Sequence, residues 1–296
     1  TIEEPINVNY RGHSIYKCGP WTQGPFLCQA LRLLSGFDLT SLGHLSVDYI
    51  HTIVEAIKLA MADRDYYYGD PDFVNVPLDV LLSDEYNHMR SKLINKHKAS
   101  MEARPGDPYN MQPIKEISSF RPGVGGTTTC VVADRWGNVV SATPSANVPE
   151  SPRDGGESGV TFSNRLRMFN TTPGHPNCIE VGKRPRSTLT PTIILKDEKP
   201  IMAISVAGGD LQDQVALNLI VNAIDFNMLP DSCVTAPRFA TTHHQDSFDP
   251  NPDREATFKN AGSVMLKEDF DNEIKEDLRR RGHTIQTTKS YIGRPV

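Results

Sequence analysis

The sequence lacks paired cysteines. Its 296 residues contain five cysteines, and no two of them are spaced as in the CxxC or CxxH ligand pairs of zinc sites. We therefore expect no disulfide framework and no zinc site. No other metal site and no cofactor are expected either. Scattered cysteines are typical of small buried side chains in a reducing compartment, which favours a cytoplasmic location. The five are Cys18, Cys28, Cys130, Cys178 and Cys233.

The sequence also has no long apolar run and no large excess of either charge. No stretch approaches the ~20 apolar residues that a bilayer-spanning helix needs. The first residues, TIEEPINVNY, are polar and acidic and do not resemble a secretion signal. The chain has 31 basic and 36 acidic residues, and its net charge of -5 does not favour binding to nucleic acid or to an anionic membrane. Neither is expected as a partner, and a signal upstream of residue 1 stays open.

The hydrophobic pattern changes along the chain. Apolar residues recur at helical spacing in the first half, where Ser46 is the expected N-cap of the longest helix. Short apolar segments bounded by turn residues follow, and these predict strands. This order predicts an α+β layered fold with antiparallel sheets. Helices are expected over residues 23–34, 46–61, 84–95, 211–228 and 268–281, and extended segments over 1–20, 127–147, 159–162, 192–196 and 201–206.

The junction at Thr127 is the most informative point of the chain. Residues 98–126 are rich in Pro, Gly, Ser and charge, which predicts an exposed loop, and they end abruptly at three threonines. Taken alone, these threonines are simply the exposed start of a hairpin with an Asp-Arg-Trp-Gly-Asn turn. However, Ser145 and Asn147 end the second strand of that hairpin, where they can lie opposite Thr127.

Two further features favour chemistry over a plain hairpin. Gly208 and Gly209 lie between an expected strand and an expected helix, a place where backbone N–H groups can face a developing oxyanion. The segment KRPRSTLTPT, residues 183–192, supplies hydroxyls and cations before another strand. Together with Thr127, these features indicate a site for nucleophilic attack.

Six blocks of the sequence resemble the γ-glutamyltransferase family, in order and at reasonable spacings. GGTTTCVVADRWGNVVSATPSAN looks like the start of the family's small subunit. GESGVTFSNRLRMF, GKRPRSTLTPTIILKDEKP, VAGGD and TAPRF are similar to later blocks, and EAIKLAMADRDYYYGDPDFVNVPLDVLLSDEY is similar to the tail of the large subunit. Each block is weak alone, but the six together cover nearly the whole chain.

The resemblance implies the organisation of an N-terminal-nucleophile hydrolase, with a four-layer αββα sandwich of antiparallel sheets between helices. Residues 1–126 would be the C-terminal part of a large-subunit-like segment, and residues 127–296 the small-subunit-like catalytic segment. Together they would form one domain of a chain that is incomplete at both ends. The resemblance also implies large and small subunits cut from one precursor, and it leaves open a dimer of such heterodimers.

The resemblance also implies the roles of individual residues. Thr127 would be the nucleophile, released when its own hydroxyl cuts the bond after Gly126. A terminal threonine can use its own α-amine as the base, because the reference pKa of that amine is about 7.7–8.0. The remaining catalytic and substrate residues implied here are Ser145, which would orient the nucleophile, Asn147, which would contact substrate, and Gly208 and Gly209, which would donate to the oxyanion.

One position departs from the family pattern. Family transferases hold the substrate α-amino group with an aspartate just before a phenylalanine, and Met168 stands there in this chain. A methionine cannot neutralise an ammonium, whereas arginines lie close by in sequence. Ser187 and Thr188 stand where the family has a pair of serines. The substrate-binding candidates are therefore Asn147, Arg165, Met168, Arg186, Ser187 and Thr188.

Three functions remain open at this point. The first is a self-processing amidohydrolase that cleaves a small-molecule amide without γ-glutamyl specificity. The second is a true γ-glutamyltransferase or glutathione hydrolase, and the third is an unprocessed binding homologue. Two other groups of residues carry less chemical weight. His51 and Glu55 are expected to be structural, and His243 and His244 are expected to be exposed loop residues rather than metal ligands.

Overall fold

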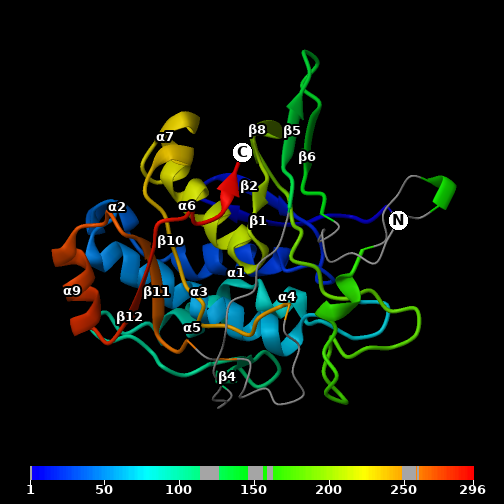
Figure 1. The fold of residues 1–296 in the computed structure, drawn as a ribbon, viewed down its shortest axis with the longest axis horizontal. Coiled ribbons are helices and arrows are strands. Elements are labelled where there is room, and N and C mark those ends of the chain that lie inside the picture. Colours follow the sequence, from blue (N-terminus) through cyan, green and yellow to red (C-terminus); the bar gives the residue numbers. More distant parts are fainter. Residues whose placement is uncertain (1, 114–126, 146–155, 159–162, 249–257, 259) are drawn as a thin grey trace.

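A four-stranded antiparallel sheet joins the two halves of the chain. The computed structural model describes residues 2–113, 127–145, 156–158, 163–248, 258 and 260–296 (Figure 1). The sheet has the order β1-β2-β7-β8, with an arginine–glycine turn between its first two strands. The chain combines helices with antiparallel strands, which confirms the expected α+β class. The strands are β1 (Ile6–Tyr10), β2 (His13–Lys17), β7 (Thr192–Lys196) and β8 (Lys199–Ile204).

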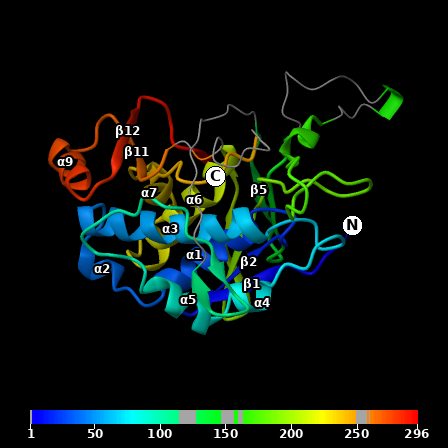
Figure 2. The same ribbon diagram turned by 90° about the horizontal axis from the view of Figure 1, so that it is seen from below.

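Three helices pack together beside this sheet. α1 (Gly24–Leu34) contacts α3 (Val47–Tyr67), α6 (Gln212–Ile224) and the first two strands. Figure 2 shows α1 and α3 lying across the molecule. Ser46 caps α3 as expected, because its hydroxyl accepts a hydrogen bond from Tyr49 N at 3.1 Å. The helix core, residues 49–65, is buried all round, which places its charged residues inside the protein.

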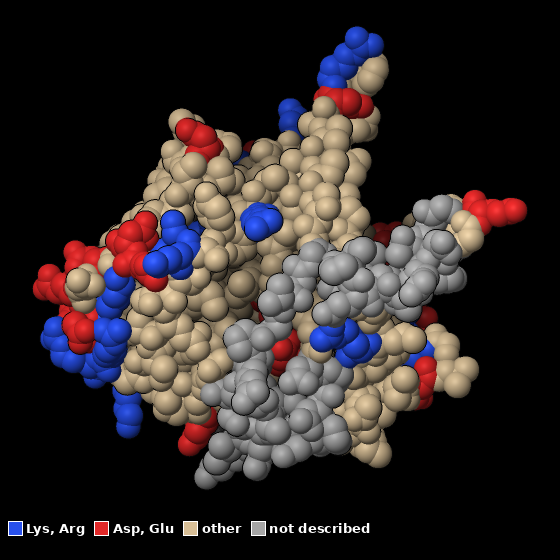
Figure 3. All heavy atoms as spheres, viewed as in Figure 1, with Lys and Arg blue, Asp and Glu red and all other residues tan. Residues whose placement is uncertain are grey.

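The hairpin that follows Thr127 projects from the body of the molecule. β5 (Cys130–Ala133) pairs with β6 (Val139–Ala142) around the expected turn. Asp134 holds the turn, since its carboxylate accepts from Trp136 N and Asn138 N. Figure 3 shows the hairpin standing clear, with charged side chains at its tip. Its apolar residues are unusually open, and Val132 is 56% exposed.

The strands of a second sheet, all beyond residue 238, were not expected from the hydrophobic pattern. β10 (Phe239–Ala240) pairs antiparallel with β11 (Ser263–Lys267), which pairs in parallel with β12 (Thr284–Thr288), and α9 (Asn272–Arg280) packs against β12. Within the described residues, no helix combines the length and apolarity needed to cross a bilayer. The remaining elements are α2 (Leu39–Leu42), α4 (Leu78–Leu81), α5 (Asp84–Ser91), α7 (Pro230–Thr235), β3 (Gly106–Asp107), β4 (Gln112–Pro113), β9 (Val206–Ala207) and β13 (Arg294–Pro295).

Several expected bounds need correction. α6 stops before residue 228 because Asn227 takes a left-handed conformation, with φ of 51°, which ends a helix. α9 starts later than residue 268 because the Asp271 side chain accepts from Glu273 N and caps the helix there. The expected strand at 159–162, and residues 114–126 of the expected loop, lie outside the described residues.

Candidate functional site

The hairpin register places Thr127 beside Ser145. Thr128 N donates to Pro144 O at 3.0 Å, which continues the β5–β6 ladder beyond its last assigned pair. One step further along the same register, Thr127 faces Ser145 across the two strands. The sequence predicted this neighbourhood. Both residues are partly buried, whereas the tip of the hairpin is open.

The end of β6 lies against the strand that leads to the paired glycines. Ser141 Oγ donates to Ile204 O at 2.8 Å, and Thr143 Oγ1 lies 2.7 Å from Ser205 Oγ in a buried contact. Residue numbers rise in the same direction on both sides of these contacts. The end of β6 therefore contacts the link between β8 and β9, and β9 leads from that link into the turn at Gly208.

The Gly208–Gly209 turn has a backbone that favours glycine. Gly208 has φ of 152° and Gly209 has φ of 59°, and side chains rarely tolerate such values. Leu211 N donates to Gly208 O at 3.1 Å, so the Gly209 N–H on the same planar peptide points the opposite way. Within the described residues, neither glycine N–H donates a hydrogen bond. Two unpaired donors on one rigid turn suit a developing oxyanion.

A buried charge network lies behind this turn. Arg64 Nη1 donates to Asp210 Oδ1 at 2.5 Å, and Ser247 donates to the same carboxylate through its N–H and its hydroxyl. Burial alone would raise the pKa of Asp210, but the Arg64 guanidinium and the Ser247 hydrogen bonds outweigh it and hold that pKa low. Gln23 connects Arg64 to the glycine turn. Gln23, Arg64, Asp210 and Ser247 were not among the residues expected from the sequence.

Phe248 lies between the glycine turn and Arg165, one of the substrate-binding candidates. A Cβ on Gly209 would lie 2.9 Å from Phe248 Cε2, so the ring packs directly on that glycine. The guanidinium carbon of Arg165 lies 5.5 Å from the centre of the same ring. Met168 is 2% exposed, and Arg165 Nη1 lies 3.3 Å from its sulfur. Phe248 therefore connects Arg165 to the glycine turn, and Met168 lies beside Arg165.

Three of the substrate-binding candidates lie beside Arg64 and the segment that enters α1. They are Arg186, Ser187 and Thr188. Arg186 is 5% exposed, and it donates to Arg64 O at 3.0 Å. The backbone of Ser187 exchanges hydrogen bonds with the segment that enters α1. Within the described residues, the buried Thr188 hydroxyl has no hydrogen-bond partner, so a water or a ligand group could bind there. Gly126 and Asn147 lie outside the described residues.

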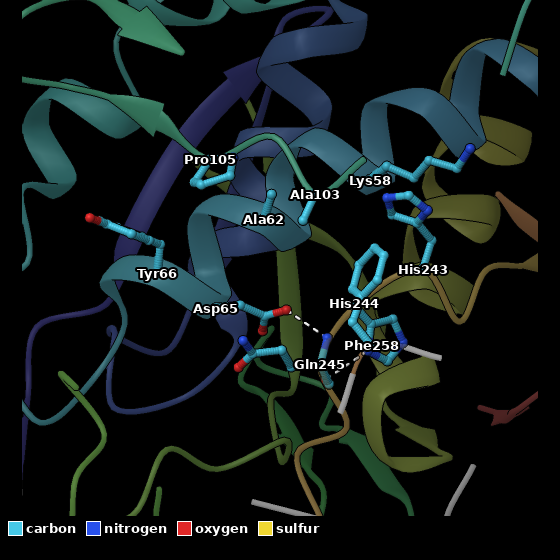
Figure 4. Close-up of a pocket in the computed structure, with 10 residues that line it drawn as sticks. All are labelled: Lys58, Ala62, Asp65, Tyr66, Ala103, Pro105, His243, His244, Gln245 and Phe258. Carbon is cyan, nitrogen blue, oxygen red and sulfur yellow. Dashed lines mark hydrogen bonds between the residues drawn. The ribbon is translucent and has the colours of Figure 1, made fainter. Parts of the chain in front are cut away.

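The small pocket in Figure 4 corrects one expectation. His243 and His244 are 1% and 2% exposed, so the expectation of exposed loop histidines is wrong. Gly262 N donates to His243 Nδ1, and Phe258 packs on the same ring. The pocket beside them holds about 20 Å³, which is room for roughly one water and not for a substrate.

A larger cavity of about 750 Å³ lies on the face of β2 and β7. Trp21, Arg184 and Glu3 form part of its rim, and Ser141 of β6 reaches its edge. Arg184 stacks over Trp21 at 5.1 Å and pairs with Asp70. This face is the open side of the four-stranded sheet.

One buried group brings potential metal ligands together. Atoms of His51, Glu55 and His283 lie within 4.8 Å of one another. The two rings already contact each other, with 2.8 Å between His51 Nδ1 and His283 Nε2. The Glu55 carboxylate binds Lys58 and Arg104. These contacts support the structural role that we expected for His51 and Glu55.

Comparison with known proteins identifies the family. A family model described as gamma-glutamyltranspeptidase matches residues 1–295. The glutathione hydrolase proenzyme of Bacillus subtilis subsp. natto is 36% identical over 256 residues, covering 82% of this chain and 42% of the relative. The solved structure of LmbA2991HD is 38% identical, with a TM-score of 0.81 over 97% of this chain and 50% of its own.

A solved cephalosporin acylase from Bacillus halodurans is 29% identical, with a TM-score of 0.78 over 99% of this chain and 48% of its own. The chain therefore spans half or less of the length of these proteins. Hydrolase and acylase names recur among the relatives, and several of them are proenzymes. The chain belongs to the gamma-glutamyltranspeptidase family, in the N-terminal-nucleophile hydrolase superfamily.

Proposed function

We propose that this chain carries the catalytic core of a self-cleaving amidohydrolase in which Thr127 is the nucleophile. One observation carries the proposal. The hairpin register pairs Thr127 with Ser145, and the same strand contacts Ser205, three residues before the unpaired N–H groups of Gly208 and Gly209 begin. Proenzyme relatives support the self-cleavage.

The same hydroxyl serves both processing and turnover. In processing, Thr127 Oγ attacks the carbonyl carbon of Gly126, the acyl group moves from nitrogen to oxygen, and water hydrolyses the ester. Glycine at position 126 offers no side chain to obstruct the attack. The released α-amine then accepts the hydroxyl proton when Thr127 attacks a substrate amide. Water resolves the resulting acyl-enzyme.

The neighbouring residues supply orientation and charge stabilisation. We assign the oxyanion hole to the N–H groups of Gly208 and Gly209, each worth ~2.7–4 kcal/mol in comparable sites. Ser145 orients the Thr127 hydroxyl or amine. Asn147, together with the pair Ser187–Thr188, contacts the substrate.

The substrate is an amide whose acyl group carries a carboxylate and no α-ammonium. Met168 occupies the position at which the family has an acid, and burying an unpaired ammonium there is costly. Arg165 supplies a cation for that carboxylate, and Arg186, which pairs with Asp65 at 3.5 Å, adds positive charge nearby. The acylase relatives support this class, whereas the glutathione hydrolase relatives support the runner-up, a γ-glutamyl substrate.

The open sheet face supports the four-layer sandwich. Tyr16, Ile193 and Leu195 line the cavity on β2 and β7, and their side chains are only partly buried. An exposed apolar face of this kind suits a second sheet packed against it. We propose that residues 1–126 and 127–296 form one domain of a longer polypeptide, and that cleavage makes them parts of two subunits.

The decisive test is the mass and N-terminal sequence of the purified full-length polypeptide. Wild type should give pieces that end at Gly126 and start at Thr127, together with amide hydrolysis. Thr127→Ala should give one uncut, inactive chain, and Thr127→Ser should keep part of both activities. Thr128→Ala, the neighbouring control, should still cleave. An uncut wild-type chain that hydrolyses amides would refute Thr127 as the nucleophile, and an uncut, inactive one would favour a binding homologue.

A further inference from the structure

Gln23 is a buried amide whose donors and acceptor are all used by the site. It precedes α1 and is 0% exposed. Its Nε2 donates to Gly209 O at 3.2 Å and to Thr188 O at 3.3 Å. Its Oε1 accepts from Arg64 Nη1 at 2.9 Å. One side chain thus ties the glycine turn to two neighbouring segments.

Arg64 grips the same turn one residue further on. Its Nη1 also reaches Asp210 Oδ1 at 2.5 Å, and its Nη2 donates to Gln245 O at 3.0 Å. Its Nε donates to Asp65 Oδ1 at 2.9 Å, so the guanidinium is held in one orientation. The peptide between Gly209 and Asp210 is therefore clamped from both ends.

This clamp matters because glycine peptides rotate easily. With no Cβ on two successive residues, the turn between Ala207 and Asp210 can adopt several backbone conformations at little cost. Fixing Gly209 O and the Asp210 side chain removes those alternatives, while Leu211 N fixes Gly208 O. Each of the two free N–H groups then keeps a fixed orientation before any substrate binds, as electrostatic preorganisation requires.

We propose that Gln23 and Arg64 are positioning residues that hold the Gly208–Gly209 turn in its oxyanion-binding conformation. The catalytic reading of this clamp rests on the function proposed above. Both residues lie upstream of Thr127, whereas the turn lies downstream of it. The segment before the cleavage bond therefore remains part of the active site after that bond is cut.

The test compares two equally buried glutamines in the full-length polypeptide. Gln23→Met removes the bonds to the turn. Gln29→Met is the matched control, because Gln29 lies on α1 and is also 0% exposed. Its Nε2 donates to Asp63 Oδ2 at 2.6 Å and makes no hydrogen bond to the glycine turn. Hydrogen exchange over residues 206–211, measured by mass spectrometry, reports the turn directly. Steady-state kinetics report the chemistry on the best amide substrate.

Gln23→Met should speed amide exchange over residues 206–211 and lower kcat at least about tenfold, with KM within about threefold, because misplaced donors weaken transition-state binding. Gln29→Met should leave both readouts within about twofold of wild type. Unchanged exchange in Gln23→Met overturns the clamp whether or not the protein is an amidase. Faster exchange with unchanged kcat overturns the positioning role. If wild type hydrolyses no amide, the proposed function fails, and exchange still decides whether Gln23 holds the turn.

Discussion

At Gly209 two independent constraints exclude a side chain. Its φ of 59° is a left-handed value, and a Cβ would lie 2.9 Å from Phe248 Cε2. We expect Gly209→Ala to displace the ring and to shift the adjacent N–H groups, lowering kcat by roughly 100-fold. The backbone strain itself should cost only about 1–2 kcal/mol of unfolding free energy. Kinetics and urea unfolding of the same preparation check both numbers.

Gly12 provides the control for backbone strain. It also has a left-handed φ, 77°, but a Cβ there would meet nothing within 4 Å. Gly12→Ala should lose a similar unfolding free energy and keep full activity. If Gly209→Ala folds stably and turns over at the wild-type rate, Gly209 has no part in the oxyanion hole.

Buried histidines make the stability of the protein depend on pH. Burial, reinforced by Lys58 and His51, lowers the pKa of His283 to about 3. The unfolded chain, with a histidine pKa near 6.5, therefore binds more protons than the folded protein between pH about 3 and 6.5. Stability contributed by neutral His283 is present above pH about 6.5 and is lost as the pH falls through this window.

His283→Gln isolates this effect. Between pH 7 and 5, the wild type should lose up to about 2 kcal/mol more unfolding free energy than the variant, since one group contributes at most about 1.4 kcal/mol per pH unit. Urea unfolding at several pH values measures the difference. Parallel pH profiles of the two proteins would mean that His283 is protonated equally in both states.

At the level of elements, local patterns predicted local structure well. Ser46 and the apolar spacing behind it identified the start of α3, and the Asp134 turn identified the β5–β6 hairpin. The pairing of β2 with β7, and the parallel pair β11–β12, could not be predicted. Those contacts join segments distant in sequence, and periodicity does not encode which strands meet.

The same limit applies to the candidate site. The neighbourhood of Thr127 and Ser145 follows from a short hairpin, so the sequence could predict it. Gln23 and Arg64 lie 186 and 146 positions from their partners in the glycine turn, and nothing in their local sequence identifies those partners. The charged residues at the end of α3 were the one available signal, because charge on a buried helix requires partners.

Contacts between elements before and after residue 126 predict that the two segments stay bound together after cleavage. β2, from residues 1–126, pairs with β7, from residues 127–296. Across the same boundary, Lys17 pairs with Asp213 at 2.7 Å with both side chains 0% exposed. Salt screens buried pairs weakly. The cut pieces should therefore co-elute in size-exclusion chromatography even at about 1 M salt.

Separation of the pieces should require denaturant at concentrations that also unfold uncut Thr127→Ala. Lys17→Met leaves Asp213 buried without its cation, which typically costs about 3–5 kcal/mol. We expect that variant to separate at lower denaturant. Native mass spectrometry of both proteins follows the change. Dissociation of cut wild-type pieces in salt alone would contradict the shared-sheet arrangement.

At the scale of the whole molecule, the chain spans 42% of the glutathione hydrolase relative and 48% of the cephalosporin acylase. The face of β2 and β7 is open over a cavity of about 750 Å³. Under the proposed function, other parts of the polypeptide can add to the pocket that we assign to Met168 and Arg165. For that reason the specificity experiment belongs to the full-length polypeptide.

The sharpest experiment compares two substrates that differ by one ammonium group. A γ-glutamyl anilide and a glutaryl anilide share the acyl length, the carboxylate and the leaving group, and only the first carries an α-amine. Met168 is buried and cannot pair with that amine, and Arg165 beside it would repel it. We expect kcat/KM to favour the glutaryl compound by at least about tenfold, the scale of one poorly accommodated group. An acid supplied by another part of the polypeptide would reverse the preference, and a higher kcat/KM for the γ-glutamyl anilide would therefore refute the specificity argued from Met168.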